Sequence, residues 1–100
     1  MKTYIVDIDG VINKTRHIHK FTEDNLRKVK PNKKFIDYFN YLKEFKKAKI
    51  IYFTARPKLS YTWTLKWLKK HNVLFDRLIM GKPLGDYYID DRNLFLEDLK

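Results

Sequence analysis

The stretch KTYIVDIDG, residues 2–10, decides how this chain is expected to fold. Its first half is a nearly continuous run of β-forming, apolar side chains, without the alternation of a strand that has one wet face. Such runs are typical of strands covered on both faces, as in a parallel sheet. We therefore predict a strand over Lys2–Ile8 that carries Asp7 and Asp9 at its end, with Gly10 permitting a sharp turn.

The rest of the chain alternates predicted helices with predicted strands, which is typical of an α/β domain with a mainly parallel sheet. At 100 residues we expect a single domain over 1–100. The predicted elements are an irregular connection over 11–30 with a short hairpin around Arg16–Phe21, a helix that begins after Pro31 and Asn32, a strand at Lys49–Phe53, a helix from Ser60 to about Lys70, short strands at Leu78–Met80 and Tyr87–Ile89, and a last helical turn between Leu94 and Leu99.

Spacing also predicts which helix faces are buried. One face of the first helix carries Phe35, Tyr38, Phe39, Leu42 and Phe45, and one face of the second carries Tyr61, Leu65 and Leu68. Two tryptophans, Trp63 and Trp67, lie four residues apart on the second helix. We expect them to form a packed face or an oligomer contact, with a base-stacking platform as the alternative.

Composition excludes several classes of protein. The chain has no cysteine, so disulfides and thiolate metal sites are absent, and no stretch approaches the about 18 apolar residues of a membrane span. We expect a cytoplasmic protein with no membrane contact. A net charge of +10 fits nucleic acid, an anionic surface or an anionic substrate, but a lysine-rich surface that keeps the protein in solution is the preferred explanation.

Aspartates and a threonine follow the first two predicted strands. Because ligands bind beyond the carboxyl ends of parallel strands, we expect Asp7, Asp9 and Thr54 to lie near one another. One aspartate could attack a phosphorus atom while the other transfers protons. The Thr54 hydroxyl and the Ala55 amide could donate hydrogen bonds to phosphoryl oxygens. The structural alternatives are a solvated strand end for the aspartates and a turn or helix cap for Thr54.

The last two predicted strands are each followed by charged residues. Lys82, held between Gly81 and Pro83, could neutralise a phosphate and a nucleophile together, although one lysine among many basic residues is weak support. Asp90 and Asp91 are adjacent carboxylates, which are costly to place together unless a cation binds. Carboxylates with substrate oxygens suit Mg²⁺. An ordinary acidic turn paired with Arg92 is the alternative.

Taken in chain order, the motifs DIDG, FTAR, GKP and YIDD resemble those of the haloacid dehalogenase superfamily. The segment from Gly81 to Arg92 is similar to small members grouped with capsular or sugar-phosphate biosynthesis. The resemblance implies a three-layer Rossmann-like fold and a phosphatase with an aspartyl-phosphate intermediate, because an aspartate stands two residues after the first. In its terms Asp7 is the nucleophile and Asp9 the acid/base.

The resemblance also implies how phosphate and metal are held. Thr54, Ala55 and Lys82 would bind the phosphoryl group. Mg²⁺ would be bound by Asp7, by the carbonyl of Asp9, and by Asp90 with Asp91. Asp86 also fits a variant of the last motif, but it precedes the predicted strand, so Asp90 and Asp91 are preferred.

The sequence has no room for a large substrate-selecting cap, so an open site is expected. The segment Asn13–Lys20 could lean over it, with Arg16, Lys20 and Arg56 as substrate contacts. His17 and His19 belong to this basic segment, with a metal site as the alternative. A neighbouring subunit in a homo-oligomer could also cover the site.

A small phosphorylated metabolite, such as a sugar phosphate or nucleotide, is the expected substrate. A nucleic-acid 3′-phosphate is the second choice. A non-catalytic basic domain that binds nucleic acid is a further alternative, and a signalling receiver domain would carry these motifs in a different order.

Overall fold

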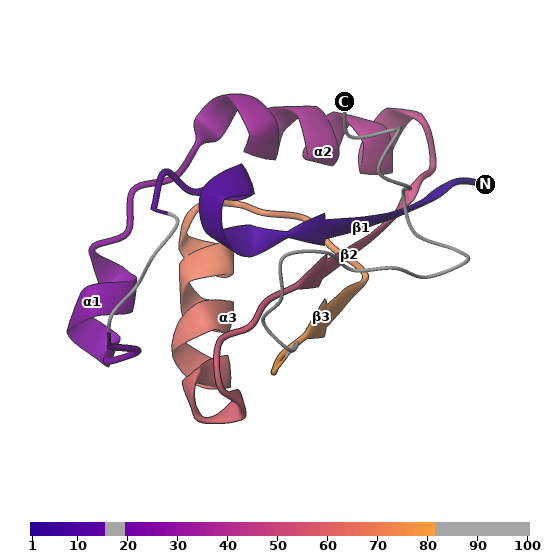
Figure 1. Cartoon of the computed structure of the whole chain (residues 1–100). Coiled ribbons are helices and arrows are strands. Elements are labelled where there is room, and N and C mark those ends of the chain that lie inside the picture. Colours follow the sequence, from indigo (N-terminus) through magenta and orange to yellow (C-terminus); the bar gives the residue numbers. More distant parts are fainter. Residues whose placement is uncertain (16–19, 82–100) are drawn as a thin grey trace, which may run out of the picture.

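The computed structural model describes residues 1–15 and 20–81 (Figure 1). The three strands form one parallel sheet in the order β1-β2-β3, which confirms an α/β fold with a parallel sheet. In chain order the elements are β1 (Thr3–Asp7), the turn η1 (Ile8–Ile12), α1 (Glu23–Arg27), α2 (Lys33–Phe45), β2 (Lys49–Phe53), the short turn η2 (Lys58–Ser60), α3 (Tyr61–Lys70) and β3 (Arg77–Ile79).

The strands end together at one edge of the sheet. Asp7 of β1 pairs with Phe53 of β2, which in turn pairs with Ile79 of β3. The pairing continues one residue further, where the Thr54 amide donates to the Ile79 carbonyl at 3.0 Å. The segments that leave the three strands are therefore brought to one place, as predicted from the sequence.

The core lies on one face of the sheet. The chain moves in one direction across the sheet, from β1 to β2 and then to β3. Because such crossovers are right-handed, the helices that connect these strands lie on the same face of the sheet. The buried side chains agree, because residues of both helices join those of one strand face in a single cluster: Val6, Ile50 and Tyr52 from the strands, Ile36 and Leu42 from α2, and Trp67 and Leu68 from α3.

The buried face of α2 agrees with the prediction at Leu42 and Phe39 and differs from it elsewhere. Phe35, Tyr38 and Phe45 are exposed, whereas Ile36 is buried. Asn40 explains the rotation, because its side chain accepts a hydrogen bond from the Leu74 amide and donates one to the Asn72 carbonyl. The helix is thus turned toward the loop before β3, and the aromatic rings of Phe35, Tyr38 and Phe45 are exposed.

The buried face of α3 also agrees only in part with the prediction, which holds for Leu68. Thr64, Trp67 and Leu68 are buried, while Tyr61 is 45% exposed. The indole N–H of Trp67 donates to the Val29 carbonyl at 2.8 Å, which fixes this rotation. The expected packed role of Trp67 is therefore confirmed, and a buried Trp67 is not available as an oligomer contact.

Helix α1 was not predicted within the connection over 11–30. Its start has a recognisable signal, because the Thr22 hydroxyl accepts a hydrogen bond from the Asn25 amide and two acidic residues follow it. The hairpin expected around Arg16–Phe21 falls mostly on residues 16–19, which lie outside the described residues, as do the predicted strand Tyr87–Ile89 and the last helical turn. Among the described residues, no helix has the length and apolar character needed to cross a membrane.

Candidate functional site

The turn after β1 is shaped by a glycine and an asparagine. Gly10 has a positive φ of 87°, which confirms the turn expected there and which other residues adopt only with strain. The side-chain oxygen of Asn13 accepts hydrogen bonds from the Gly10 amide at 3.0 Å and the Thr15 amide at 3.1 Å. Asn13 is buried and closes the loop, and Asp7, the last residue of β1, is half-buried.

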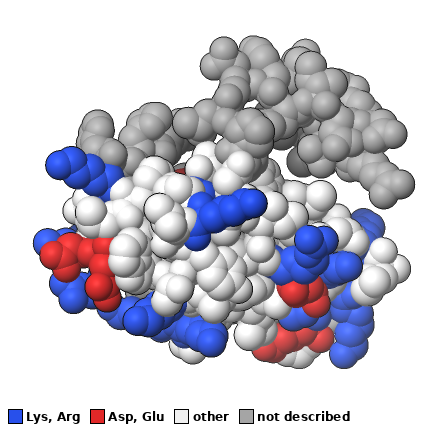
Figure 2. Space-filling view, turned by 90° about the horizontal axis from the view of Figure 1, so that it is seen from below, with Lys and Arg blue, Asp and Glu red and all other residues white. Residues whose placement is uncertain are grey.

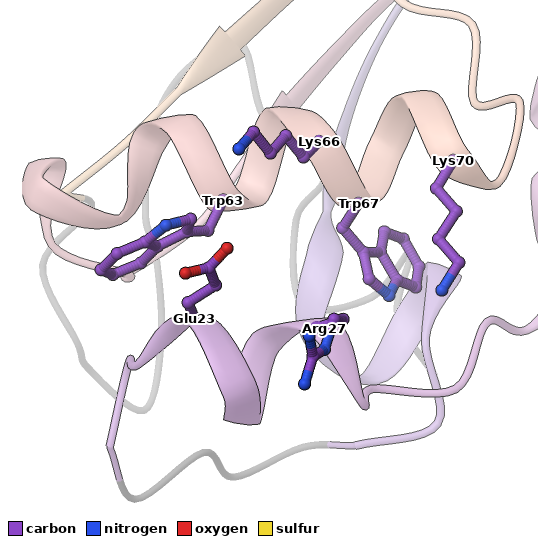
Figure 3. Close-up of a pocket in the computed structure, with 6 residues that line it drawn as sticks. All are labelled: Glu23, Arg27, Trp63, Lys66, Trp67 and Lys70. Atoms are coloured by element: carbon purple, nitrogen blue, oxygen red, sulfur yellow. The ribbon is translucent and has the colours of Figure 1, made fainter.

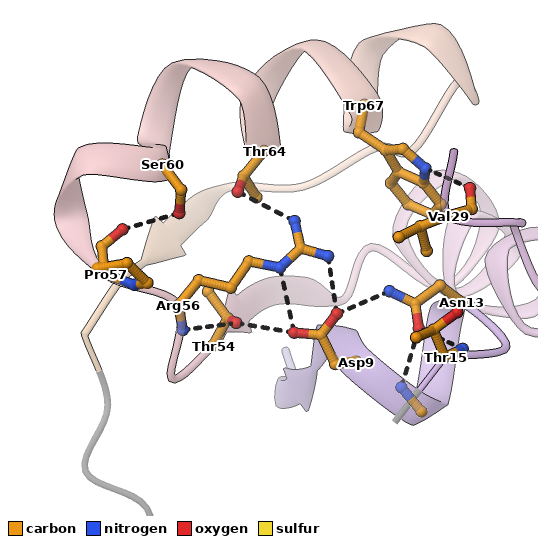
Figure 4. Close-up of polar contacts among 11 residues, drawn as sticks. Asp9, Asn13, Thr15, Val29, Thr54, Arg56, Pro57, Ser60, Thr64 and Trp67 are labelled. Atoms are coloured by element: carbon orange, nitrogen blue, oxygen red, sulfur yellow. Dashed lines mark hydrogen bonds and ion pairs between the residues drawn. The ribbon is translucent and has the colours of Figure 1, made fainter. Parts of the chain in front are cut away.

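Four hydrogen-bond donors converge on the carboxylate of Asp9 (Figure 4). Arg56 donates twice, with Nη2 at 2.7 Å from Oδ1 and Nε at 3.1 Å from Oδ2. The Asn13 amide nitrogen lies 2.9 Å from Oδ1, and the Thr54 hydroxyl lies 3.2 Å from Oδ2. Residues after β1 and β2 therefore fix one carboxylate at the shared edge of the sheet.

Arg56 is itself held from the other side. Its side chain is 0% exposed, and its Nη1 donates to the Thr64 hydroxyl of α3 at 3.0 Å. The sequence placed Arg56 among the substrate contacts, but the structure directs its guanidinium to Asp9 and Thr64. Removing one partner of a buried ion pair leaves the charge of the other partner uncompensated. Asp9 and Arg56 therefore each need the other for a stable fold.

Thr54 stands where the sequence predicts it, directly after β2. Its hydroxyl donates to Asp9 and accepts from the Arg56 amide at 3.1 Å, and the residue is fully buried. In this arrangement the hydroxyl stabilises the turn after β2 and helps to hold the Asp9 carboxylate. The following residue, Ala55, is half-buried.

Several predicted site residues fall outside the described part of the chain: Arg16, His17, His19, Lys82, Asp90 and Asp91. Lys20 is described and exposed, and its carbonyl accepts a hydrogen bond from the Asn25 side chain at 3.0 Å. Within the described ranges, no group of three or more histidines and acids could hold a metal ion.

The described residues nevertheless fit part of an Mg²⁺ site. Asp7 offers a carboxylate and Asp9 a main-chain carbonyl, both oxygen donors of the type that Mg²⁺ prefers. The Asp9 side chain is engaged by four donors, which leaves its carbonyl as the group to offer a metal.

Two of the supporting residues could not be assigned from sequence. Asn13 gave a weak signal, since an asparagine soon after Asp-x-Asp-Gly is typical of a side-chain-closed turn. Thr64 gave none, because its role depends on how α3 packs against the end of β2.

No family model matches this chain, and no curated protein is significantly similar to it. Among solved structures, the chain is similar to a target protein from Vibrio cholerae, with a TM-score of 0.62 and 29% sequence identity. The similarity covers 94% of this chain and 83% of the other. That protein carries no functional name, so the likeness bears on the α/β fold.

Proposed function

We propose that this chain is a cytoplasmic, Mg²⁺-dependent phosphatase of the haloacid dehalogenase type, with a three-layer Rossmann-like fold and no cap. Its proposed substrate is a small phosphorylated metabolite, such as a sugar phosphate or a nucleotide. The observation that carries the proposal is the meeting of Asp9 and Thr54. These residues are 45 positions apart, yet their side chains are 3.2 Å apart at the carboxyl edge that also carries Asp7.

The proposed reaction has two steps. A carboxylate oxygen of Asp7 attacks phosphorus and forms the new O–P bond. The bond to the leaving oxygen breaks as Asp9, which must carry a proton in the substrate complex, supplies that proton to the leaving oxygen. Water then attacks the same phosphorus while Asp9 takes its proton, and the Asp7–phosphate bond breaks to release phosphate. Both aspartates return to their starting states.

The residues around Asp9 fix its position, but all four of their contacts are donors, so the proposal also requires that Asp9 exchange one of them for the proton that it supplies. A proton-transferring group must be held in a fixed position, and Arg56, Thr54 and Asn13 provide contacts to both carboxylate oxygens. Arg56 is thus a positioning residue in the proposal rather than a substrate contact. When bound by Asp7, the Asp9 carbonyl and the predicted Asp90 and Asp91, Mg²⁺ would supply positive charge to the phosphoryl oxygens.

The test is a phosphatase screen in the presence of Mg²⁺. Sugar phosphates, nucleotides and 3′-phosphorylated oligonucleotides are compared for phosphate release by the wild-type protein and by Asp7→Asn. We expect turnover of a small metabolite that is lost in Asp7→Asn, since the amide is nearly isosteric but a poor nucleophile. Equal turnover by pure, folded Asp7→Asn would refute the covalent mechanism, and a strong preference for the 3′-phosphorylated strand would reverse the choice of substrate.

A further inference from the structure

A groove of about 270 Å³ lies between α1 and α3 (Figure 3). Both tryptophans of the chain contribute to it and point from α3 toward α1. Its lining consists of Glu23, Arg27, Trp63, Lys66, Trp67 and Lys70. None of these residues has a part in the proposed phosphatase chemistry.

The two indoles have different roles in this groove. Trp67 is 2% exposed, is hydrogen-bonded to the Val29 carbonyl at 2.8 Å, and lies 4.5 Å from the His71 ring between ring centres. It is therefore a fixed part of the wall. Trp63, one turn earlier on α3, is only half-buried and offers an accessible ring.

The charges around the indoles favour an anion. Arg27, Lys66 and Lys70 line the groove, against one acid, Glu23. Arg27 also pairs with Asp24 at 2.8 Å, but that pair is largely exposed and weak. Within the described ranges, neither lysine forms an ion pair, so both ammonium groups can meet a ligand.

We propose that this groove binds single-stranded nucleic acid, with one base stacked on Trp63 and neighbouring phosphates on Lys66 and Lys70. Stacking on an aromatic ring beside basic groups is how proteins bind single strands without reading their sequence. The groove is smaller than the pockets of about 300–1,000 Å³ that enclose a whole small molecule. Its size therefore suits the ring system of a single base. The two lysines are separated by about 6 Å along the helix, since each residue rises about 1.5 Å.

Charge alone would not locate such a site. On the face seen from below, lysines and arginines lie in several separate groups (Figure 2). The groove is distinguished by an accessible indole together with basic groups. The proposal does not depend on phosphatase activity, because binding is measured without turnover.

The experiment follows tryptophan fluorescence, since Trp63 and Trp67 are the only tryptophans in the chain. An unphosphorylated oligothymidylate of about ten nucleotides, within the known range of single-strand site sizes, is titrated without Mg²⁺. We expect saturable quenching, and an affinity that falls with salt with a log–log slope of about −1.4 if the two phosphates on Lys66 and Lys70 are neutralised. Duplex DNA of the same length, thymidine monophosphate and polyglutamate are expected to bind more weakly.

Substitutions distinguish binding in the groove from general electrostatic attraction to the basic protein surface. We expect Trp63→Ala to weaken binding at least about fivefold, the lower range for loss of one stacked base, and Trp63→Phe to retain part of the affinity. Lys66→Gln and Lys70→Gln should each reduce the salt slope by about 0.7. Lys69→Gln, an exposed lysine of α3 outside the groove, is the matched control and should keep the wild-type slope. Circular dichroism checks that each variant is folded.

The proposal is overturned if the oligonucleotide causes no quenching, or if folded Trp63→Ala binds it as well as the wild type. Equal affinity for polyglutamate or duplex DNA would show attraction by charge alone. Equal affinity for thymidine monophosphate would show a site for a free nucleotide instead of a strand.

Discussion

The guanidinium of Arg56 closes on both carboxylate oxygens of Asp9, at 2.7 Å from Oδ1 and 3.1 Å from Oδ2. The arginine side chain is fully buried and that of the aspartate is 17% exposed. This ion pair joins the turn after β1 to the segment after β2, and the Thr64 hydroxyl joins both to α3. It therefore links the stability of the fold with the geometry of the proposed active site.

Loss of this ion pair is expected to destabilise the protein. Arg56→Ala should lower the free energy of unfolding by about 3–5 kcal/mol, because a poorly solvated carboxylate loses its partner. Chemical denaturation measures the change. Arg27→Ala is the matched control, since its pair with Asp24 is 61% and 70% exposed and should contribute less than about 1 kcal/mol. Similar losses in the two variants would contradict this account.

A conservative substitution of Arg56 distinguishes its effect on the position of Asp9 from its effect on the stability of the protein. Arg56→Lys keeps the positive charge but loses the forked contact to both oxygens of Asp9. If the chain is the proposed phosphatase, kcat should fall about 10- to 100-fold with little change in KM, as expected for a misplaced proton-transferring group. Steady-state kinetics on the best substrate of the screen measures the two constants. A rise in KM at unchanged kcat would instead place Arg56 in substrate binding.

Metal dependence provides a separate test of the proposed mechanism. Activity should be lost after chelation, be restored by Mg²⁺ and be inhibited by Ca²⁺, whose longer bonds and looser geometry would displace the phosphoryl group from Asp7. Phosphate release after metal exchange is the measurement. Full activity in the chelated protein would count against any role for the metal.

Tyr52 offers a stabilising substitution. Its phenol is fully buried in the core, and its hydroxyl has no hydrogen-bond partner among the residues that the structure describes. Burial raises the pKa of the group well above its usual value. Because an unsatisfied buried hydroxyl costs about 1–3 kcal/mol, Tyr52→Phe should leave the free energy of unfolding unchanged or raise it by about 1 kcal/mol. Tyr38→Phe on the exposed face of α2 is the control. A marked loss of stability in Tyr52→Phe would mean that the hydroxyl is satisfied in solution.

Asp76 predicts a pH-dependent contribution to stability. Hydrogen bonds from the Lys43 ammonium and the Ile50 amide, each at 2.8 Å, hold the pKa of Asp76 below its usual value. A carboxyl with a lowered pKa stabilises the fold above its unfolded pKa, and this contribution is lost as the pH falls through the lower, folded value. Asp76→Asn should therefore be less stable than the wild type near neutral pH, with the difference shrinking in acid. Denaturation across a pH series from neutral to acid checks this, and a constant difference would contradict it.

The sequence by itself determined the strands β1 and β2 and the edge at which they end. Continuous apolar runs marked β1 and β2, because buried parallel strands lack alternation, and the β2 bounds agree residue for residue. The polar residues after these runs, Asp7, Asp9 and Thr54, were placed correctly at one edge, since parallel strands must end together.

Only the tertiary structure decided which helix faces are buried and what Arg56 contacts. Apolar side chains lie on more than one face of α2 and α3. The faces that are buried agree with distant polar contacts, which join Asn40 to the loop before β3 and Trp67 to Val29. Arg56 is likewise paired with a carboxylate 47 residues away. Contacts between residues far apart in the chain leave no periodic pattern, so they become visible only once the sheet and helices have brought those residues together.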